Sequence, residues 1–133
     1  MAIYFLDTNH LSPALNRVSP LRDRILQAGK TGSRFGTCWP VLCELEAGIV
    51  RTKNPARNRR TLSSLLEKIA IWPFDWEVVR KFGAISLLSR QRGRVLSPVD
   101  ITLVALAQIE DATLLTADLD FSLFPEIRVE NWQ

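Results

Sequence analysis

The sequence predicts one α/β domain whose central, mostly parallel sheet is flanked by helices. Short apolar runs alternate along the chain with stretches of helical periodicity, which is the pattern of strands joined by crossover helices. The length of 133 residues suits a single domain over residues 1–133, with enough chain to bury a core. A content of 47% hydrophobic and 23% charged residues is typical of a folded globular protein.

The first half of the chain is predicted to hold two strands and three helices. The strands are expected at Ile3–Asp7 and Arg34–Cys38, and the helices over about 9–17, from Ser19 to near Gly29, and over Pro40–Val50. Ser19-Pro20 is a good cap and first-turn pair, and Gly29 is a typical helix stop. The third helix has an apolar face made by Val41, Leu42, Leu45 and Ile49.

The second half is predicted to hold three more helices and three extended segments. The helices are expected from Asn54-Pro55 through an apolar stripe ending at Ile69, from Asp75 to Gly93, and from Ser97-Pro98 to Glu110. The extended segments are a brief one at 70–74, a buried strand at 112–116 and an edge strand at 127–132. The helix "PVDITLVALAQIE" is apolar on most sides, which indicates a central position.

Several classes of protein are not favoured by the composition. No apolar run approaches the roughly 20 residues that cross a bilayer, and the N-terminus lacks the pattern of a signal peptide, so we expect a cytoplasmic protein. Cys38 and Cys43 are interpreted as small buried hydrophobic residues rather than as a disulfide. Together with the single His10 they are too few for a zinc site.

Charge is distributed unevenly along the chain. Residues 1–98 hold 16 Lys and Arg against 7 Asp and Glu, whereas residues 99–133 hold 1 against 7. The densest basic stretch, "RTKNPARNRR", contains Arg51, Lys53, Arg57, Arg59 and Arg60. Such a run is by default a solvated helix face, and a polyanionic partner becomes the better interpretation only if an acidic, metal-binding centre lies nearby.

Four carboxylates are predicted to meet at one edge of the sheet. Asp7 ends the first strand, Asp118 follows the strand at 112–116, and Glu44 lies about one turn into the helix after the second strand. Asp100 begins a helix that leads into a parallel strand, so it also starts at the edge where strands finish. This is the edge where open α/β sheets bind their ligands.

Each acid also has a purely structural interpretation. Asp7 is placed to cap the first helix, and Asp100 lies three residues after Ser97 in a capping-box-like arrangement. Glu44, with Glu46 as its neighbour, could be a solvated helix residue. Asp118 and Asp120 could be turn formers. None of these alternatives requires the four side chains to converge.

Convergence of carboxylates favours a site for a hard divalent cation. Close carboxylates repel and some would protonate unless a cation neutralised them. Oxygen donors with no suitable His or Cys fit Mg²⁺ or Mn²⁺, which serve phosphodiester hydrolysis. Thr8, Asn9 and Thr116 are short polar residues that could orient the ligands or water.

Four motifs carry a resemblance to a known family. "FLDTN", "ELEAG", "PVDITLVALA" and "LLTADLDF" resemble, in order and spacing, those of the PIN-domain ribonucleases, and most closely the VapC-type toxins of toxin–antitoxin pairs. The resemblance extends from Ile3 to Trp132. It implies a Rossmann-like PIN fold and a Mg²⁺- or Mn²⁺-dependent endoribonuclease.

The resemblance also implies roles for individual residues. Asp7, Glu44, Asp100 and Asp118 match the family's acidic quartet, with Asp7 and Asp100 as the foremost metal ligands, and Thr116 matches its hydroxyl position. The family's last motif often has Asn at the place of Asp118, which leaves open whether Asp118 binds metal or positions water, with Asp120 as a candidate to assist. The basic stretch 51–60 falls where such toxins can contact RNA.

The family's partners and products follow from the same resemblance. Its members cut RNA to leave 5′-phosphate and 3′-hydroxyl ends, so the expected substrate is a tRNA, rRNA or mRNA. They commonly form homodimers and are silenced by a cognate VapB-like antitoxin. Operator DNA is expected to be bound only through that antitoxin.

Two alternative functions remain. A catalytically silent PIN-like module that binds RNA or protein would need no cluster of repelling acids. A haloacid-dehalogenase-type phosphatase also begins with a strand ending in Asp, but it requires a second acid where Asn9 stands and a late Lys, whereas no Lys follows Lys81.

The remaining candidate residues are given structural roles. His10 is expected to be a cap-region or surface residue without a catalytic role. The tryptophans at 39, 72, 76 and 132 could stack on bases, but their apolar surroundings favour core or dimer packing.

Overall fold

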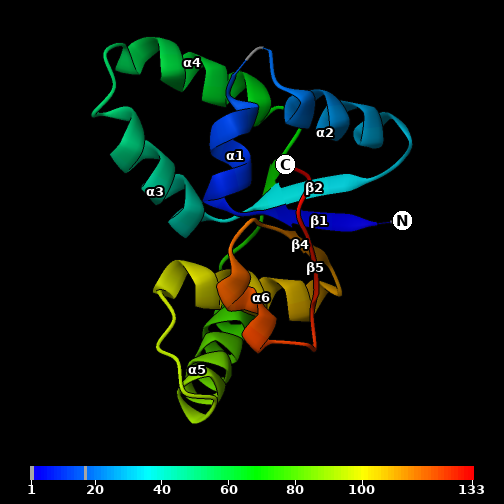
Figure 1. The fold of residues 1–133 in the computed structure, drawn as a ribbon, viewed down its shortest axis with the longest axis vertical. Helices are drawn as coiled ribbons and strands as arrows, with labels where there is room; N and C mark the ends of the chain where they lie inside the picture. The colour runs from blue at the N-terminus through cyan, green and yellow to red at the C-terminus, as the bar shows by residue number, and fades with distance from the viewer. Residues whose placement is uncertain (1, 17) are drawn as a thin grey trace.

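The computed structural model describes residues 2–16 and 18–133 and contains a five-stranded sheet (Figure 1). The strand order is β3-β2-β1-β4-β5, and every neighbouring pair is parallel. The strands are β1 (Ile3–Leu6), β2 (Arg34–Thr37), β3 (Ala70–Ile71), β4 (Thr113–Leu115) and β5 (Arg128–Glu130). The α/β class and the parallel sheet are confirmed, with β3 and β5 as edges.

Helices cover both faces of the sheet (Figure 1). They are α1 (Thr8–Ala14), α2 (Pro20–Lys30), α3 (Trp39–Ile49), α4 (Pro55–Leu65), α5 (Trp76–Gln91) and α6 (Pro98–Glu110), with a short 3₁₀ helix, η1, at Leu119–Leu123. In the view of Figure 1, α1 to α4 lie above the sheet and α5 and α6 below it. None of the helices in the described part of the chain is long and apolar enough to span a membrane.

Side-chain caps fix where most of the helices begin. Ser19, Asn54, Asp75 and Ser97 each accept a hydrogen bond from the backbone N–H three residues later. Such caps satisfy N–H groups that have no partner inside the helix. The predicted helix starts at these residues are therefore confirmed.

Several details differ from the sequence prediction. Strand β1 ends at Leu6 rather than Asp7, and α4 ends at Leu65 rather than at Ile69. The first helix begins one residue earlier, at Thr8, because Asp7 caps it, and it ends at Ala14; the predicted end at residue 17 lies outside the described residues. Strand β2 ends at Thr37 because Cys38 is the extended residue before α3. The 3₁₀ helix η1 was not predicted, because five residues are too short for a periodic signal.

The core lies between the central strands and α6. Phe5 and Leu6 of β1 and Leu114 and Leu115 of β4 are fully buried. Every residue of α6 from 101 to 107 is buried as well, which confirms the predicted central helix. These contacts hold the carboxyl ends of β1 and β4 rigidly beside each other.

A glycine in β2 is required by close packing. A Cβ atom at Gly36 would lie 2.6 Å from Trp72 and 2.8 Å from the buried ring of Phe5. Gly36→Ala is therefore expected to lower the free energy of unfolding by about 1–3 kcal/mol, as overpacking does. Denaturant unfolding measures this change.

The matched control for Gly36 is Gly83, in the middle of α5, where no atom lies within 4 Å of an added Cβ. Gly83→Ala is expected to leave the stability unchanged or to raise it by about 0.5–1 kcal/mol, since Ala favours helix. A Gly36→Ala protein as stable as the wild type would show that the packing around β2 is looser than described.

Candidate active site

Asp7 lies at the carboxyl end of β1 and is 5% exposed. Its Oδ1 accepts a hydrogen bond from the Thr8 backbone N–H at 2.7 Å, and Oδ2 accepts one from the Thr116 hydroxyl at 2.9 Å. The side chain therefore caps α1 with one oxygen while the other faces the end of β4. The capping and active-site interpretations of Asp7 are compatible.

Glu44 reaches the same edge from α3. Glu44 is an exposed residue, and its Oε1 accepts a hydrogen bond from the Thr8 hydroxyl at 2.7 Å. The Glu46 side chain instead binds Arg59, whose Nε donates a hydrogen bond to Glu46 Oε1 at 2.8 Å. The two neighbouring acids of α3 thus have different surroundings, and only Glu44 is tied to the residue that follows Asp7.

Asp100 lies in the first turn of α6, where its backbone N–H donates to the Ser97 hydroxyl. Burial raises the pKa of Asp100 to about 6, and the charges of Asp7, Asp118 and Glu44 add to this effect. Burial likewise raises the pKa of Asp7, with further contributions from Glu44 and Asp118. The four acids predicted from sequence are therefore close enough to repel one another.

Asp118 lies three positions after the end of β4, in a tight turn. Its N–H donates to the Thr116 hydroxyl at 3.0 Å, and its Oδ1 accepts from the Asp120 N–H at 2.8 Å. Asp118 is thus a turn former, as the structural interpretation predicted, but only its Oδ1 takes part in the turn. The Asp120 carboxylate instead pairs with Arg94.

Asn9 joins the ends of β1 and β4. Its Nδ2 donates to Asp7 Oδ2 at 3.3 Å and to Thr116 Oγ1 at 3.1 Å, while Oδ1 accepts from the Ala117 N–H at 3.0 Å. Thr8, Asn9 and Thr116, the three polar residues singled out in the sequence, all contact one of the acids directly.

The donor chemistry of this edge fits a hard divalent cation. All the acids carry oxygen donors, and burial together with the neighbouring carboxylates raises the pKa values of Asp7 and Asp100. Within residues 2–16 and 18–133, no three His, Cys, Asp or Glu side chains are arranged to hold one ion directly. Such an edge suits Mg²⁺, which commonly keeps several waters and binds through one or two carboxylates.

The five basic residues of this stretch have three different surroundings. Arg51, Lys53 and Arg57 line a groove of about 980 Å³ that also contains Thr8 and Glu44. Arg59 is paired with Glu46, and Arg60 lines a smaller hollow with Arg22 and Arg57. Three of the five basic residues therefore share a groove with the acidic edge.

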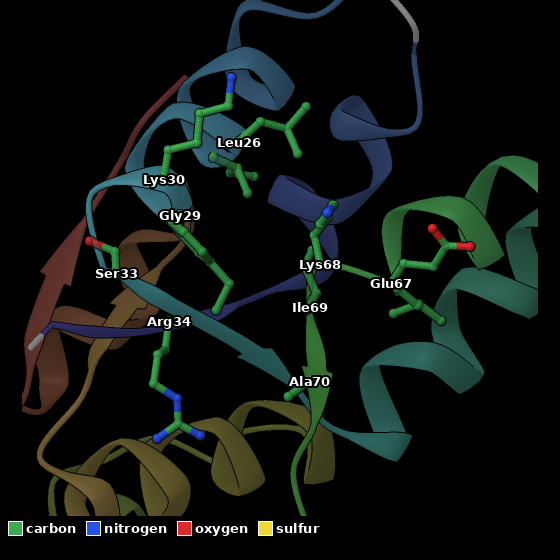
Figure 2. Close-up of a pocket in the computed structure, with 12 residues that line it drawn as sticks. Leu26, Gly29, Lys30, Ser33, Arg34, Glu67, Lys68, Ile69 and Ala70 are labelled. Atoms are coloured by element: carbon green, nitrogen blue, oxygen red, sulfur yellow. The ribbon is translucent and has the colours of Figure 1, made fainter.

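A second groove lies at the opposite ends of the strands (Figure 2). It has a volume of about 690 Å³ and lies where β2 and β3 begin, between the end of α2 and the segment after α4. Lys30, Arg34 and Lys68 stand around it (Figure 2). It contains none of the predicted catalytic acids.

Several structural roles assigned from the sequence need correction. His10 is fully buried rather than at the surface, and burial lowers its pKa to about 4. Trp72 and Trp132 pack against the core as predicted, whereas Trp39 and Trp76 are 56% and 72% exposed. Sequence neighbours do not distinguish these pairs. Trp76 lies between Asp75 and Glu77 and Trp132 lies between Asn131 and Gln133, yet only Trp132 packs against the core.

The cysteines also differ from each other. Both are free, and Cys38 is buried, which raises the pKa of its thiol to about 12. Cys43 is exposed on α3, so the expectation that both are buried is wrong for this residue. Neither lies in a group arranged to hold a metal among the residues described.

Comparisons with known proteins agree on one family. A family model described as PIN domain matches residues 4–127. The chain is 27% identical over 131 residues to Ribonuclease VapC2 of Rickettsia felis, with 98% of both proteins covered.

Solved structures are similar over the same length. The crystal structure of VapBC2 from Rickettsia felis bound to a DNA fragment from their promoter matches with a TM-score of 0.87 and 26% identity, covering 98% of this chain and 99% of that one. DNA-bound VapBC from Salmonella typhimurium matches in fold, with a TM-score of 0.84, 22% identity and complete coverage of both chains. Because the family model extends from the first strand, β1, to the residue before the last strand, β5, the chain belongs to the PIN-domain family.

Proposed function

We propose that this protein is a VapC-type toxin, an endoribonuclease that hydrolyses RNA and is neutralised by a VapB-like antitoxin. The observation that carries the proposal is the position of Asp7, Glu44, Asp100 and Asp118 at one edge of a PIN-domain sheet. A relative named a ribonuclease, matched over 98% of its length, supports the same activity.

Asp7 and Asp100 are proposed as the direct ligands of Mg²⁺ or Mn²⁺. Burial, together with the neighbouring carboxylates, raises the pKa of both side chains, so a bound cation would stabilise their ionised forms. When bound, the cation supplies Lewis acidity toward water and phosphate oxygens, which phosphodiester hydrolysis requires. Glu44 and Asp118 are proposed to add charge and to orient water at the rim.

The polar neighbours are proposed to hold these carboxylates in position. Thr116 and Asn9 both donate to Asp7 Oδ2, and Thr8 donates to Glu44. These bonds restrict the rotation of the Asp7 and Glu44 side chains, which prepares the site before substrate arrives. Asp118 keeps one carboxylate oxygen outside the bond to the Asp120 N–H.

RNA is proposed to enter along the groove of Arg51, Lys53 and Arg57. These three side chains are exposed and line the same groove as Glu44. An RNA backbone bound to them would therefore pass the acidic edge. Arg60 lies farther along the same surface with Arg57, whereas Arg59 is already paired with Glu46. The basic groove is thus expected to bind the same RNA molecule that the acidic edge cleaves.

Neutralising the groove should weaken RNA binding. The triple variant Arg51→Gln, Lys53→Gln, Arg57→Gln is expected to bind single-stranded RNA less tightly and to lower the slope of log affinity against log salt by about 2, since about 0.7 counterion is released per contact. Fluorescence anisotropy with labelled RNA over a range of salt concentrations measures both quantities.

The matched control removes the same charge at the opposite ends of the strands. Lys30→Gln, Arg34→Gln, Lys68→Gln changes the groove of Figure 2 and should leave the salt slope nearly unchanged. Equal losses in the two triple variants would show that net charge, rather than the groove beside Glu44, governs RNA binding.

The partners are proposed from the relatives. The Rickettsia felis and Salmonella typhimurium structures are VapBC complexes with DNA, which supports a VapB-like antitoxin through which operator DNA would be bound. A homodimer is also proposed, and the exposed Trp39, Phe74 and Trp76 are available for such a contact. The phosphatase alternative is excluded by membership of the PIN family.

The test of the proposed function is RNA cleavage by the purified protein. With Mg²⁺ or Mn²⁺ it should cut RNA to leave 5′-phosphate and 3′-hydroxyl ends, and chelation of the cation should stop the reaction. Sequencing of 5′ ends after brief expression in cells identifies the target. A protein that binds RNA but never cuts it, with either cation, would favour the silent binding module.

A further inference from the structure

The C-terminal residues lie against the beginning of α1, far away in sequence. The Trp132 backbone N–H donates to His10 Nε2 at 3.0 Å, and the Gln133 side-chain amide donates to the Asn9 carbonyl. In Figure 1 the C-terminus lies beside α1 and β2. The last two residues therefore contact the segment that follows Asp7.

These contacts determine which nitrogen of His10 carries the proton. A backbone N–H can only donate, so Nε2 must be the acceptor for Trp132. The neutral ring therefore has its proton on Nδ1, which lies 2.8 Å from Asn9 Oδ1. His10 is fully buried, so both ring nitrogens depend on partners within the protein.

The orientation of the Asn9 amide follows from that proton. Oδ1 receives two donors, His10 Nδ1–H and the Ala117 N–H at 3.0 Å. Nδ2 must then face the other way, toward Asp7 Oδ2 and Thr116 Oγ1. A flipped amide would set its NH₂ group against two donors, so His10 selects the orientation that serves Asp7.

Trp132 is held firmly enough to anchor this chain of hydrogen bonds. Its ring lies 4.9 Å from Tyr4 and 5.9 Å from Phe35, and the Arg24 guanidinium lies 4.0 Å above it. The indole N–H donates to Glu130 at 3.0 Å. Contacts with β1, β2 and α2 thus fix the backbone N–H that His10 accepts.

We propose that His10 is a positioning residue for the cation site. In the tautomer that Trp132 selects, its Nδ1–H fixes the Asn9 amide that holds the Asp7 carboxylate. This inference rests on the proposed function, because it concerns the affinity of Asp7 for a divalent cation. It extends that function to a buried residue outside the four acids.

Two variants separate the hydrogen bond from His10 to Asn9 from the hydrogen bond that His10 accepts from Trp132. His10→Asn can keep an N–H near the position of Nδ1, and so the donor to Asn9, but it loses the acceptor for Trp132. His10→Gln keeps an acceptor near the position of Nε2 but loses the donor to Asn9. Both should lower the melting temperature of the cation-free protein by comparable amounts.

Calorimetric titration with Mn²⁺ alone then distinguishes positioning from simple packing. His10→Gln is expected to bind Mn²⁺ about tenfold more weakly than the wild type, and His10→Asn within about twofold of it. Wild-type affinity in His10→Gln, or an equal loss in both variants, would overturn the inference. A wild-type protein that binds no Mn²⁺ would instead refute the proposed cation site itself.

A second measurement needs no variant. His10 is the only histidine, so nitrogen-15 NMR reports its ring without ambiguity. The proton is expected on Nδ1, and Mg²⁺ should shift both ring signals at the concentrations that saturate the site. A proton on Nε2, or ring signals indifferent to saturating Mg²⁺, would contradict the positioning role.

Discussion

Asp7→Asn is expected to reduce RNA cleavage by roughly a hundredfold or more and to relieve growth arrest in cells that express the protein. The substitution removes a charge proposed to hold the cation, whose contribution to such hydrolysis is several kcal/mol. Asn is as good a helix cap as Asp, so α1 should still begin at Thr8. Cleavage rates on the same RNA, with circular dichroism to verify the fold, measure the effect.

The matched control for Asp7→Asn is Glu46→Gln. Glu46 is another acid near the active-site edge, but it is paired with the exposed Arg59. Its loss should change cleavage little. Full activity of an Asp7→Asn protein, purified free of contaminating nuclease, would refute the proposed role of Asp7.

Asp100→Asn is expected to stabilise the cation-free protein near pH 7.5 while abolishing cation binding. The pKa of Asp100 is raised from 3.8 to about 6, so the folded state holds this proton more tightly than the unfolded state does. Its contribution to stability is therefore lost as the pH rises from about 4 through about 6. Because the residue is only partly buried, the gain on substitution is on the order of 1 kcal/mol, or about 3–5 °C.

The measurement is a melting curve at each pH for both proteins in a chelator. His10 acts with the opposite sign, because burial lowers its pKa to about 4 and its contribution grows as the pH rises through the same range. The difference between Asp100→Asn and wild type removes that common effect. A constant difference from pH 4 to pH 7.5 would show that the Asp100 pKa is not raised.

Adding Mn²⁺ should reverse the order of stability. The wild type gains from binding by mass action, whereas Asp100→Asn should gain little. If Mn²⁺ raised the melting temperature of Asp100→Asn as much as that of the wild type, Asp100 would not be a ligand of the cation.

The position of the acids could be predicted because it follows from chain direction. Parallel strands joined by helices bring the end of β1 and the start of α6 to one edge, whatever the side chains are. Helix starts were equally predictable, since Ser19, Asn54 and Ser97 act through their own backbone neighbours. Chain direction and local capping patterns were therefore enough to predict most of the fold and the edge where the acids lie.

Pairing between distant side chains could not be predicted in the same way. Glu44 and Glu46 look alike in the sequence, yet one accepts from Thr8 and the other pairs with Arg59. His10 meets Trp132 across 122 positions in the chain, and no periodicity or spacing indicates that contact. Such choices depend on the packed geometry of the whole domain.

The central claim is that carboxylates from separate segments share one divalent cation. The most direct measurement is a crystal of the protein soaked in Mn²⁺, with diffraction recorded to give anomalous differences. One strong peak in contact with carboxylate oxygens of both Asp7 and Asp100 is predicted. A saturated crystal with no peak at this edge, or with Asp7 and Asp100 turned away from each other, would contradict the account.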